Sequence, residues 1–181
     1  GDRHAHYAGL GAINYDVENP EYVVPEFVCS SISAFVRAPF VKRPMARMDL
    51  GHLSGYVPEG SETELCNLNI FMRYGAIAAD VMAKTNDLEQ AIAASTGSPN
   101  PHLLYAENDT HGYGFAKFDA EKVECDVYVI ENKSWDQAAQ PDGPDALRVV
   151  RFQVPLWEGG EAPVMSRIGK TLFGPVEHGE P

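Results

Sequence analysis

The first six residues of the chain gather one carboxylate and two imidazoles: Gly1-Asp2-Arg3-His4-Ala5-His6. In an extended backbone, side chains two residues apart point to the same side, so Asp2 and His4 could meet at one ion. Carboxylate oxygen and imidazole nitrogen together suit iron, zinc or manganese, or a mixed pair of metals. The same spacing also occurs by chance on surface loops, and both interpretations stay open at this point.

Composition limits the classes of partner. The 181 residues carry a net charge of −12, with 44% hydrophobic and 22% charged residues, as in an ordinary globular domain with one core. No basic stripe is present to neutralise phosphates, which argues against a nucleic-acid partner. No apolar run is long enough to span a bilayer. An anionic substrate would be repelled unless bound cations reversed the local field.

The cysteines and the beginning of the chain bear on its organisation. Cys29, Cys66 and Cys125 are too few and too spread for a disulfide scaffold, so one bridge plus a thiol and three buried thiols both remain open. The chain begins on the metal motif without a Met. We therefore expect an upstream segment of the same gene to provide most ligands. Residues 1–181 alone are then expected to be poorly soluble, metal-poor and inactive.

Two helices are predicted in the middle of the chain. The first covers Leu68–Lys84, where apolar residues recur at steps of three and four. Its predicted apolar face consists of Ile70, Tyr74, Ile77 and Val81. Asn86 and Glu89 resemble a capping box, which predicts a second helix from Asp87 to about Ser95.

Before these helices the pattern is less regular. Residues 7–22 are expected to form a loop because glycine, asparagine and proline interrupt them. Tyr7 in this loop is the residue best placed to line a site beside the motif. Val23–Ile32 is predicted to be a buried strand. Glu26 within it either faces solvent, which we favour, or orients a metal ligand.

After the helices the period becomes strand-like. Four strands are predicted, at His102–Ala106, Gly112–Phe118, Val123–Ile130 and Leu147–Val154, joined as an antiparallel meander over about 102–155. His102 and His111 flank the first turn of the meander and are interpreted as ordinary hairpin residues. The tail at 157–181 is expected to be irregular.

A long excursion at 38–66 has no clear period. It begins beside the only basic cluster in the acidic chain, made of Arg37, Lys42, Arg43 and Arg47. The cluster could cover an anionic substrate, and neutralising it would then raise the KM for a charged ester. A solvated loop or a docking surface is the interpretation we favour.

Three blocks resemble the C-terminal part of the PhoD-like alkaline phosphatases and phosphodiesterases. Residues 1–4 are similar to that family's G-D-x-H metal motif, and residues 26–33 (EFVCSSIS) resemble its E-F-V-T-P-S-I-T strand. Residues 100–105 (NPHLLY), followed by Gly112-Tyr113, resemble its N-P-H-I-K-Y segment and the R-G-Y strand after it. Order and rough spacing agree over about two thirds of the chain.

The resemblance implies that residues 1–181 of this α/β chain are the C-terminal portion of one catalytic domain, which is a four-layer α/β sandwich metallophosphatase. It also implies hydrolysis of phosphate mono- or diesters at an iron–calcium centre, in a periplasmic or secreted protein. Asp2 and His4 match the last two metal ligands of the family pattern, and the other ligands would lie upstream of Gly1. The attacking group cannot be identified from these residues.

The chain also departs from the family pattern. Tyr7 stands near the position of the family's Trp, Cys29-Ser30 replaces Thr-Pro, and the excursion at 38–66 has no counterpart. These departures leave the substrate open. The alternative function is a non-catalytic, acidic, β-rich binding or interaction domain, and metal content distinguishes the two.

Overall fold

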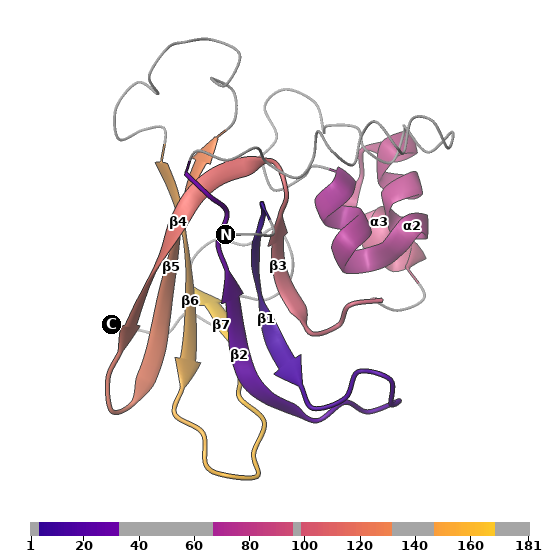
Figure 1. The fold of residues 1–181 in the computed structure, drawn as a ribbon. Coiled ribbons are helices and arrows are strands. Elements are labelled where there is room, and N and C mark those ends of the chain that lie inside the picture. Colours follow the sequence, from indigo (N-terminus) through magenta and orange to yellow (C-terminus); the bar gives the residue numbers. More distant parts are fainter. Residues whose placement is uncertain (1–3, 33–66, 96–98, 132–146, 169–181) are drawn as a thin grey trace.

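The computed structural model describes residues 4–32, 67–95, 99–131 and 147–168 of the chain. These residues form a mixed α/β structure with two antiparallel sheets and two helices (Figure 1). In chain order the elements are β1 (His6–Ala12), β2 (Tyr22–Val28), α2 (Asn67–Thr85), α3 (Leu88–Ala94), β3 (Leu103–Glu107), β4 (Thr110–Phe118), β5 (Lys122–Glu131), β6 (Leu147–Pro155) and β7 (Ser166–Ile168). None of the described helices is long and apolar enough to cross a membrane.

The two sheets pack against each other around one core. The inner sheet has the order β2-β1-β3, and the meander sheet has the order β4-β5-β6-β7. Tyr105 of the inner sheet contacts Phe152 of the meander sheet, with ring centroids 5.5 Å apart, and both are fully buried. Ala8, Val127 and Val150 fill the same core. The two helices lie beside β3, on the side away from the meander sheet (Figure 1).

The meander is confirmed for its last three strands and wrong for the first. β4, β5 and β6 pair in chain order, whereas β3 pairs with β1 through Ala8 and Tyr105. The segment Asn108-Asp109 therefore carries the chain from one sheet to the other instead of closing a hairpin. Burial of Tyr105 between the sheets favours this pairing over a local hairpin with β4.

The loop predicted at 7–22 is also wrong in its first half, because β1 is the central strand of the inner sheet. Its glycines allow close packing. A Cβ on Gly9 would lie only 2.5 Å from the carbonyl oxygen of His102, so a larger residue would push β3 away. That carbonyl instead accepts a hydrogen bond from the Leu10 N–H at 2.9 Å. The glycines here mark close backbone approach, not a turn.

The predicted strand at 23–32 is real, but β2 lies at an edge of the inner sheet and is not fully buried. Val23 and Val24 are exposed. Glu26 is also exposed, which confirms the solvent-facing interpretation of this carboxylate. An edge strand that carries a charge is protected from pairing with further chains.

Both helices are confirmed, with one change in the buried face of α2. Gly75 has a φ of 85°, which interrupts the helix and rotates its second half. Ile77 of the predicted apolar face is consequently 56% exposed, and Ala78, Ala79 and Met82 are buried instead. The capping box expected at Asn86 and Glu89 is wrong by one residue: the N-cap of α3 is Asp87, whose side chain accepts a hydrogen bond from the Gln90 N–H.

The C-terminal prediction is wrong at one point, because the tail expected to be irregular contains β7, which pairs with β6. The excursion at 38–66, its basic cluster and Cys66 lie outside the described residues.

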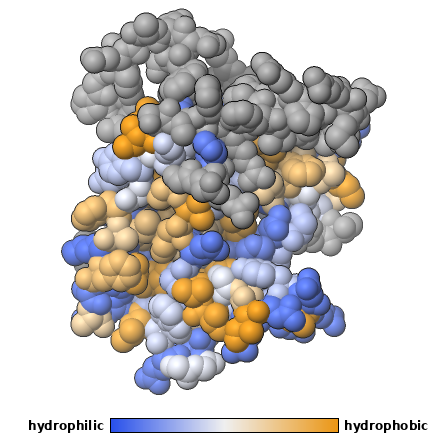
Figure 2. Space-filling model, in the orientation of Figure 1, coloured by the Kyte–Doolittle hydropathy of each residue, from blue (hydrophilic) through white to orange (hydrophobic). Residues whose placement is uncertain are grey.

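On the face shown in Figure 2, the described hydrophobic residues form several separate groups among hydrophilic ones. Exposed aromatic residues such as Phe115 and Phe118 belong to the meander sheet.

Because Cys125 lies in the core, we expect its thiol to react slowly in the native protein. Cys29 and Cys125 are both free thiols, and burial raises the pKa of Cys125 to about 12. Because the thiolate is the reactive form, we expect iodoacetamide at pH 8 to label Cys125 roughly a hundredfold more slowly in the native protein than after unfolding. Peptide mapping by mass spectrometry measures both rates, and equal rates would contradict the buried position.

Candidate functional site

Buried polar side chains converge where the inner sheet meets the meander sheet. We call this group, together with the partly exposed Arg148 that pairs with it, the junction cluster: His6, Asn69, Glu107, Asn108, His111 and Arg148. Its members come from β1, α2, the end of β3 with the segment that follows it, β4 and β6. Burying so many polar groups is costly unless they bind one another, and the cluster is indeed hydrogen-bonded.

His6 has a structural role in this cluster. Its Nδ1 accepts a hydrogen bond from the Ser30 N–H at 3.1 Å, and its Nε2 donates to the His111 carbonyl at 3.2 Å. Burial lowers the pKa of His6 to about 4, so the imidazole is neutral at neutral pH. With both ring nitrogens bound to backbone groups of β4 and of the segment after β2, His6 joins the two sheets and is not available as a metal ligand.

Glu107 is the charged centre of the junction cluster. Its fully buried carboxylate accepts hydrogen bonds from Asn69 Nδ2 at 3.1 Å and from the Asp109 N–H at 3.3 Å. Arg148 pairs with its other oxygen at 3.3 Å. These donors stabilise the ionised carboxylate in a place where an unpaired charge would be strongly unfavourable.

Hydrogen bonds extend from the cluster to Tyr7. The Asn108 Nδ2 donates to Asn69 Oδ1 at 2.8 Å, and Asn108 Oδ1 accepts from the Tyr7 hydroxyl at 2.6 Å. The position of the Tyr7 ring is therefore fixed by the same network that holds Glu107.

The motif that opened the chain lies at the edge of this region. His4 lies two residues before the start of β1 and has a φ of 54°, so the backbone is not extended at this residue. A histidine in the left-handed region is uncommon, and such strained positions concentrate at functional sites. Asp2 lies outside the described residues. Among the residues that are described, no three His, Cys, Asp or Glu side chains form a group that could hold a metal ion.

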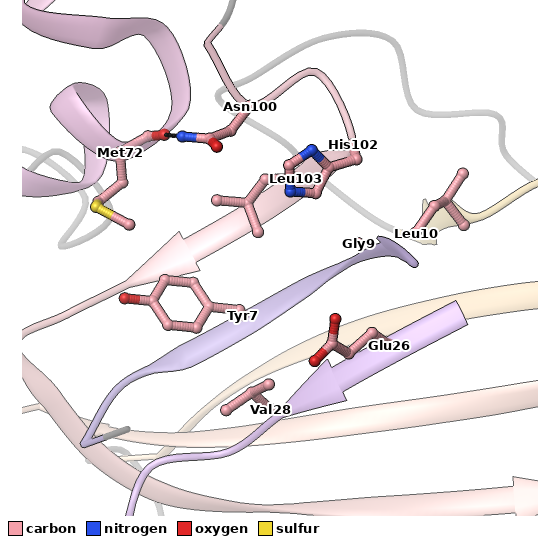
Figure 3. Close-up of a pocket in the computed structure, with 9 residues that line it drawn as sticks. All are labelled: Tyr7, Gly9, Leu10, Glu26, Val28, Met72, Asn100, His102 and Leu103. Carbon is pink, nitrogen blue, oxygen red and sulfur yellow. Dashed lines mark hydrogen bonds between the residues drawn. The ribbon is translucent and has the colours of Figure 1, made fainter. Parts of the chain in front are cut away.

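A pocket of about 300 Å³ opens on the other side of Tyr7, over the face of the inner sheet that looks away from the meander sheet (Figure 3). Its lining comes from all three strands of the inner sheet, α2 and the segment before β3: Tyr7, Gly9, Leu10, Glu26, Val28, Met72, Asn100, His102 and Leu103. Tyr7 thus lines a pocket, although its role toward a substrate stays a prediction.

Sequence reasoning missed most of these residues. His102 was interpreted as an ordinary hairpin residue, and it lines the pocket instead. Glu107 and Asn69 gave no local signal, because a polar residue at the end of a strand or helix is usually solvated. One usable signal was the run Glu107-Asn108-Asp109, which is unusually polar for a segment that follows the apolar Leu103–Ala106.

No protein-family model, no curated protein and no solved structure matches this chain.

We expect a substitution in the junction cluster to lower the stability of the protein strongly. Replacing Glu107 with Gln keeps the shape of the side chain but removes the buried negative charge that Arg148 contacts at 3.3 Å. We expect a loss of about 3 kcal/mol in the free energy of unfolding, as for other partly buried ion pairs that lose one member. Urea denaturation measures it.

The matched control is Glu124→Gln. Glu124 pairs with Lys122 at 3.3 Å on the half-exposed surface of β5, where an ion pair contributes at most about 1 kcal/mol. Equal effects of the two substitutions would contradict a central role for Glu107.

Proposed function

We propose that this chain is the C-terminal part of a metal-dependent hydrolase of phosphate mono- or diesters, similar to the PhoD-like phosphatases. In this proposal an upstream segment of the same protein completes both the four-layer sandwich and the metal site. Export to the periplasm or beyond, and a centre of iron and calcium, belong to the same proposal and rest on the resemblance alone.

One observation carries the proposal further than the sequence does. The second and third blocks of the resemblance, and the strand that follows the first block, are far apart in the chain, yet they lie in the same inner sheet (Figure 1). The strand after the His4 motif, β1, pairs with β2 of the second block and with β3 of the third. Segments that form one site are expected to be brought together in this way, whereas chance matches of the second and third blocks have no reason to lie on either side of β1.

The donor types of Asp2 and His4 fit the proposed metals. A carboxylate suits the harder ion, and the imidazole of His4 suits a transition ion. When bound, such metals would hold phosphate oxygens and stabilise the charge that develops during hydrolysis. The left-handed backbone of His4 supports this assignment, because strain of this kind is retained where a side chain must point in one direction.

Other residues of the chain would act around the site. His6 and its two backbone hydrogen bonds hold the beginning of β1, and thereby the backbone that leads from His4, against both sheets. Tyr7 belongs to β1, the same strand as His6. Its hydroxyl donates a hydrogen bond to Asn108, which fixes the position of the ring. We propose Tyr7 as a substrate-positioning residue.

A binding domain without catalytic activity is the second candidate. It is favoured by the pocket beside Tyr7, which is built without any residue of the motif, and by the lack of a three-ligand group among the described residues. The two candidates differ in metal content and in turnover.

The deciding experiment uses the protein together with its upstream segment. Metal analysis should find close to stoichiometric iron or a similar transition ion, and a chelator should abolish hydrolysis of a nitrophenyl phosphate mono- or diester. Metal-free protein whose properties do not change with chelator would reject the hydrolase and leave the binding domain.

A further inference from the structure

We propose that the pocket beside Tyr7 is a binding site for a small organic cation, such as a primary amine on a short apolar chain. The site is separate from the motif residues and does not rest on the proposed hydrolase activity. Its volume, about 300 Å³, is at the lower end of the range for small-molecule sites.

The charge in the pocket is that of Glu26. Its carboxylate points into the space between Tyr7, Leu10 and His102 (Figure 3). Within the described part of the chain it makes no ion pair with a lysine or arginine, whereas Asp80, Glu107, Glu124 and Asp126 each do. The carboxylate is therefore available to a cation from solution, and the acidic chain as a whole attracts cations.

His102 shapes the same end of the pocket without cancelling that charge. Burial lowers the pKa of His102, although Glu26 opposes the shift, so the imidazole is neutral near pH 7. The ring of His102 contacts Tyr15 with centroids 4.7 Å apart, and its backbone carbonyl is bound to the Leu10 N–H. The unprotonated ring nitrogen of a neutral imidazole can accept a hydrogen bond from an ammonium group, and the uncharged ring does not repel it.

The walls select an organic cation over a metal ion. One carboxylate and one imidazole are too few ligands for a metal, and no third ligating side chain joins them among the described residues. The remaining walls include Val28, Met72 and Leu103, which together offer an apolar surface to a hydrocarbon chain. An ammonium group at Glu26 and an alkyl chain toward Met72 would satisfy both parts of the lining.

The pocket is held in place by the fold. Gly9 admits the His102 carbonyl because it has no Cβ, and Asn100 fixes α2 by donating to the Met72 carbonyl at 2.6 Å. Tyr7 is fixed from the opposite side by Asn108. A site whose walls are fixed in advance loses little entropy when it binds a ligand.

The test is isothermal titration of the protein, with its upstream segment where the gene encodes one, using n-hexylamine at pH 7.5. We expect saturable binding that is at least fivefold tighter than that of n-hexanol, which has the same chain and no charge. Glu26→Gln should weaken hexylamine binding at least fivefold and leave the melting temperature unchanged, because Glu26 is an exposed residue.

Glu21→Gln is the matched control. It removes the same charge from an exposed residue just before β2 that does not line the pocket, and it should leave the affinity unchanged. Equal weakening by both substitutions would mean general attraction by an acidic protein and would overturn the site. Hexanol binding as tightly as hexylamine, or no saturable binding at all, would also overturn it.

Discussion

Gly112→Ala is expected to destabilise the protein by more than about 3 kcal/mol, and to leave little folded protein at 37 °C. Gly112 lies in β4 with a φ of 150°, a conformation that L side chains rarely adopt. A Cβ at this position would overlap the backbone carbonyl oxygen of Tyr128 in β5 and would lie 3.1 Å from Cε1 of His6. Neither neighbour can move easily, because one is part of a sheet and the other is held by two hydrogen bonds.

The site of this glycine explains the size of the effect. The Gly112 N–H contacts the Ser31 carbonyl at 3.4 Å, and His111 Nδ1 donates to the same carbonyl at 3.2 Å. Together with His6, these groups fasten the segment after β2 to the start of β4. A side chain on Gly112 would therefore separate the inner sheet from the meander sheet, as well as distort one strand.

Substitutions at two other glycines distinguish the cost of a steric clash from the cost of backbone strain. Gly160 has a φ of 97° and nothing near its Cβ position, so Gly160→Ala should cost only about 1 kcal/mol of strain. Gly159 is equally open and does not have such a φ, so Gly159→Ala should change stability by less than about 0.5 kcal/mol. Urea denaturation of all three variants gives the comparison. If Gly112→Ala behaves like Gly160→Ala, the close approach to Tyr128 and His6 is wrong.

The elements that sequence reasoning predicted correctly are those whose signal is local. In β5, the alternation of Val123, Cys125, Val127 and Val129 with polar residues is written into ten consecutive positions, and the strand pairs on both sides as expected. The repeat in α2 is equally local, and it failed only beyond Gly75, where the break turned Ile77 outward.

The misread elements depend on contacts that are distant in the chain. Glycines of β1 resemble turn residues, and only the approach of the His102 carbonyl shows why Gly9 belongs in a strand. Asn108 and Asp109 are good turn residues, but Asn108 is occupied by Asn69 and Tyr7. Neither partner can be identified before the fold is known.

The residues of the candidate site also differ in whether local sequence or distant contacts identify them. His4 could be selected from its spacing to Asp2, because ligand spacing is a local property. The pocket could not be predicted, because its lining comes from four segments that are distant in the chain. Its one charged residue, Glu26, looks like any other exposed carboxylate on an edge strand. His6, chemically identical to His4 and two residues away, is set apart only by its hydrogen bonds to Ser30 and His111.

If the proposed hydrolase is correct, His4→Ala is expected to lower hydrolysis of a phosphate ester more than about a hundredfold and to reduce the metal content. Even residues that only support a metal ligand change affinity or activity by about 10- to 100-fold when they are removed, so loss of a ligand should exceed that range. Asp2→Ala should behave similarly. Asp16→Ala, which removes a carboxylate from an exposed position in the connection between β1 and β2, should leave both quantities unchanged.

A second substitution at His4 distinguishes the role of the imidazole ring from the effect of the left-handed backbone. His4 has a φ of 54°, so alanine at this position adds strain, whereas glycine adopts that conformation freely. His4→Gly should therefore fold at least as well as His4→Ala and still be inactive and metal-poor, if the ring is what binds metal. A fully active His4→Gly protein with unchanged metal content would show that His4 serves only the geometry of the chain entering β1, and it would remove the main support for the hydrolase.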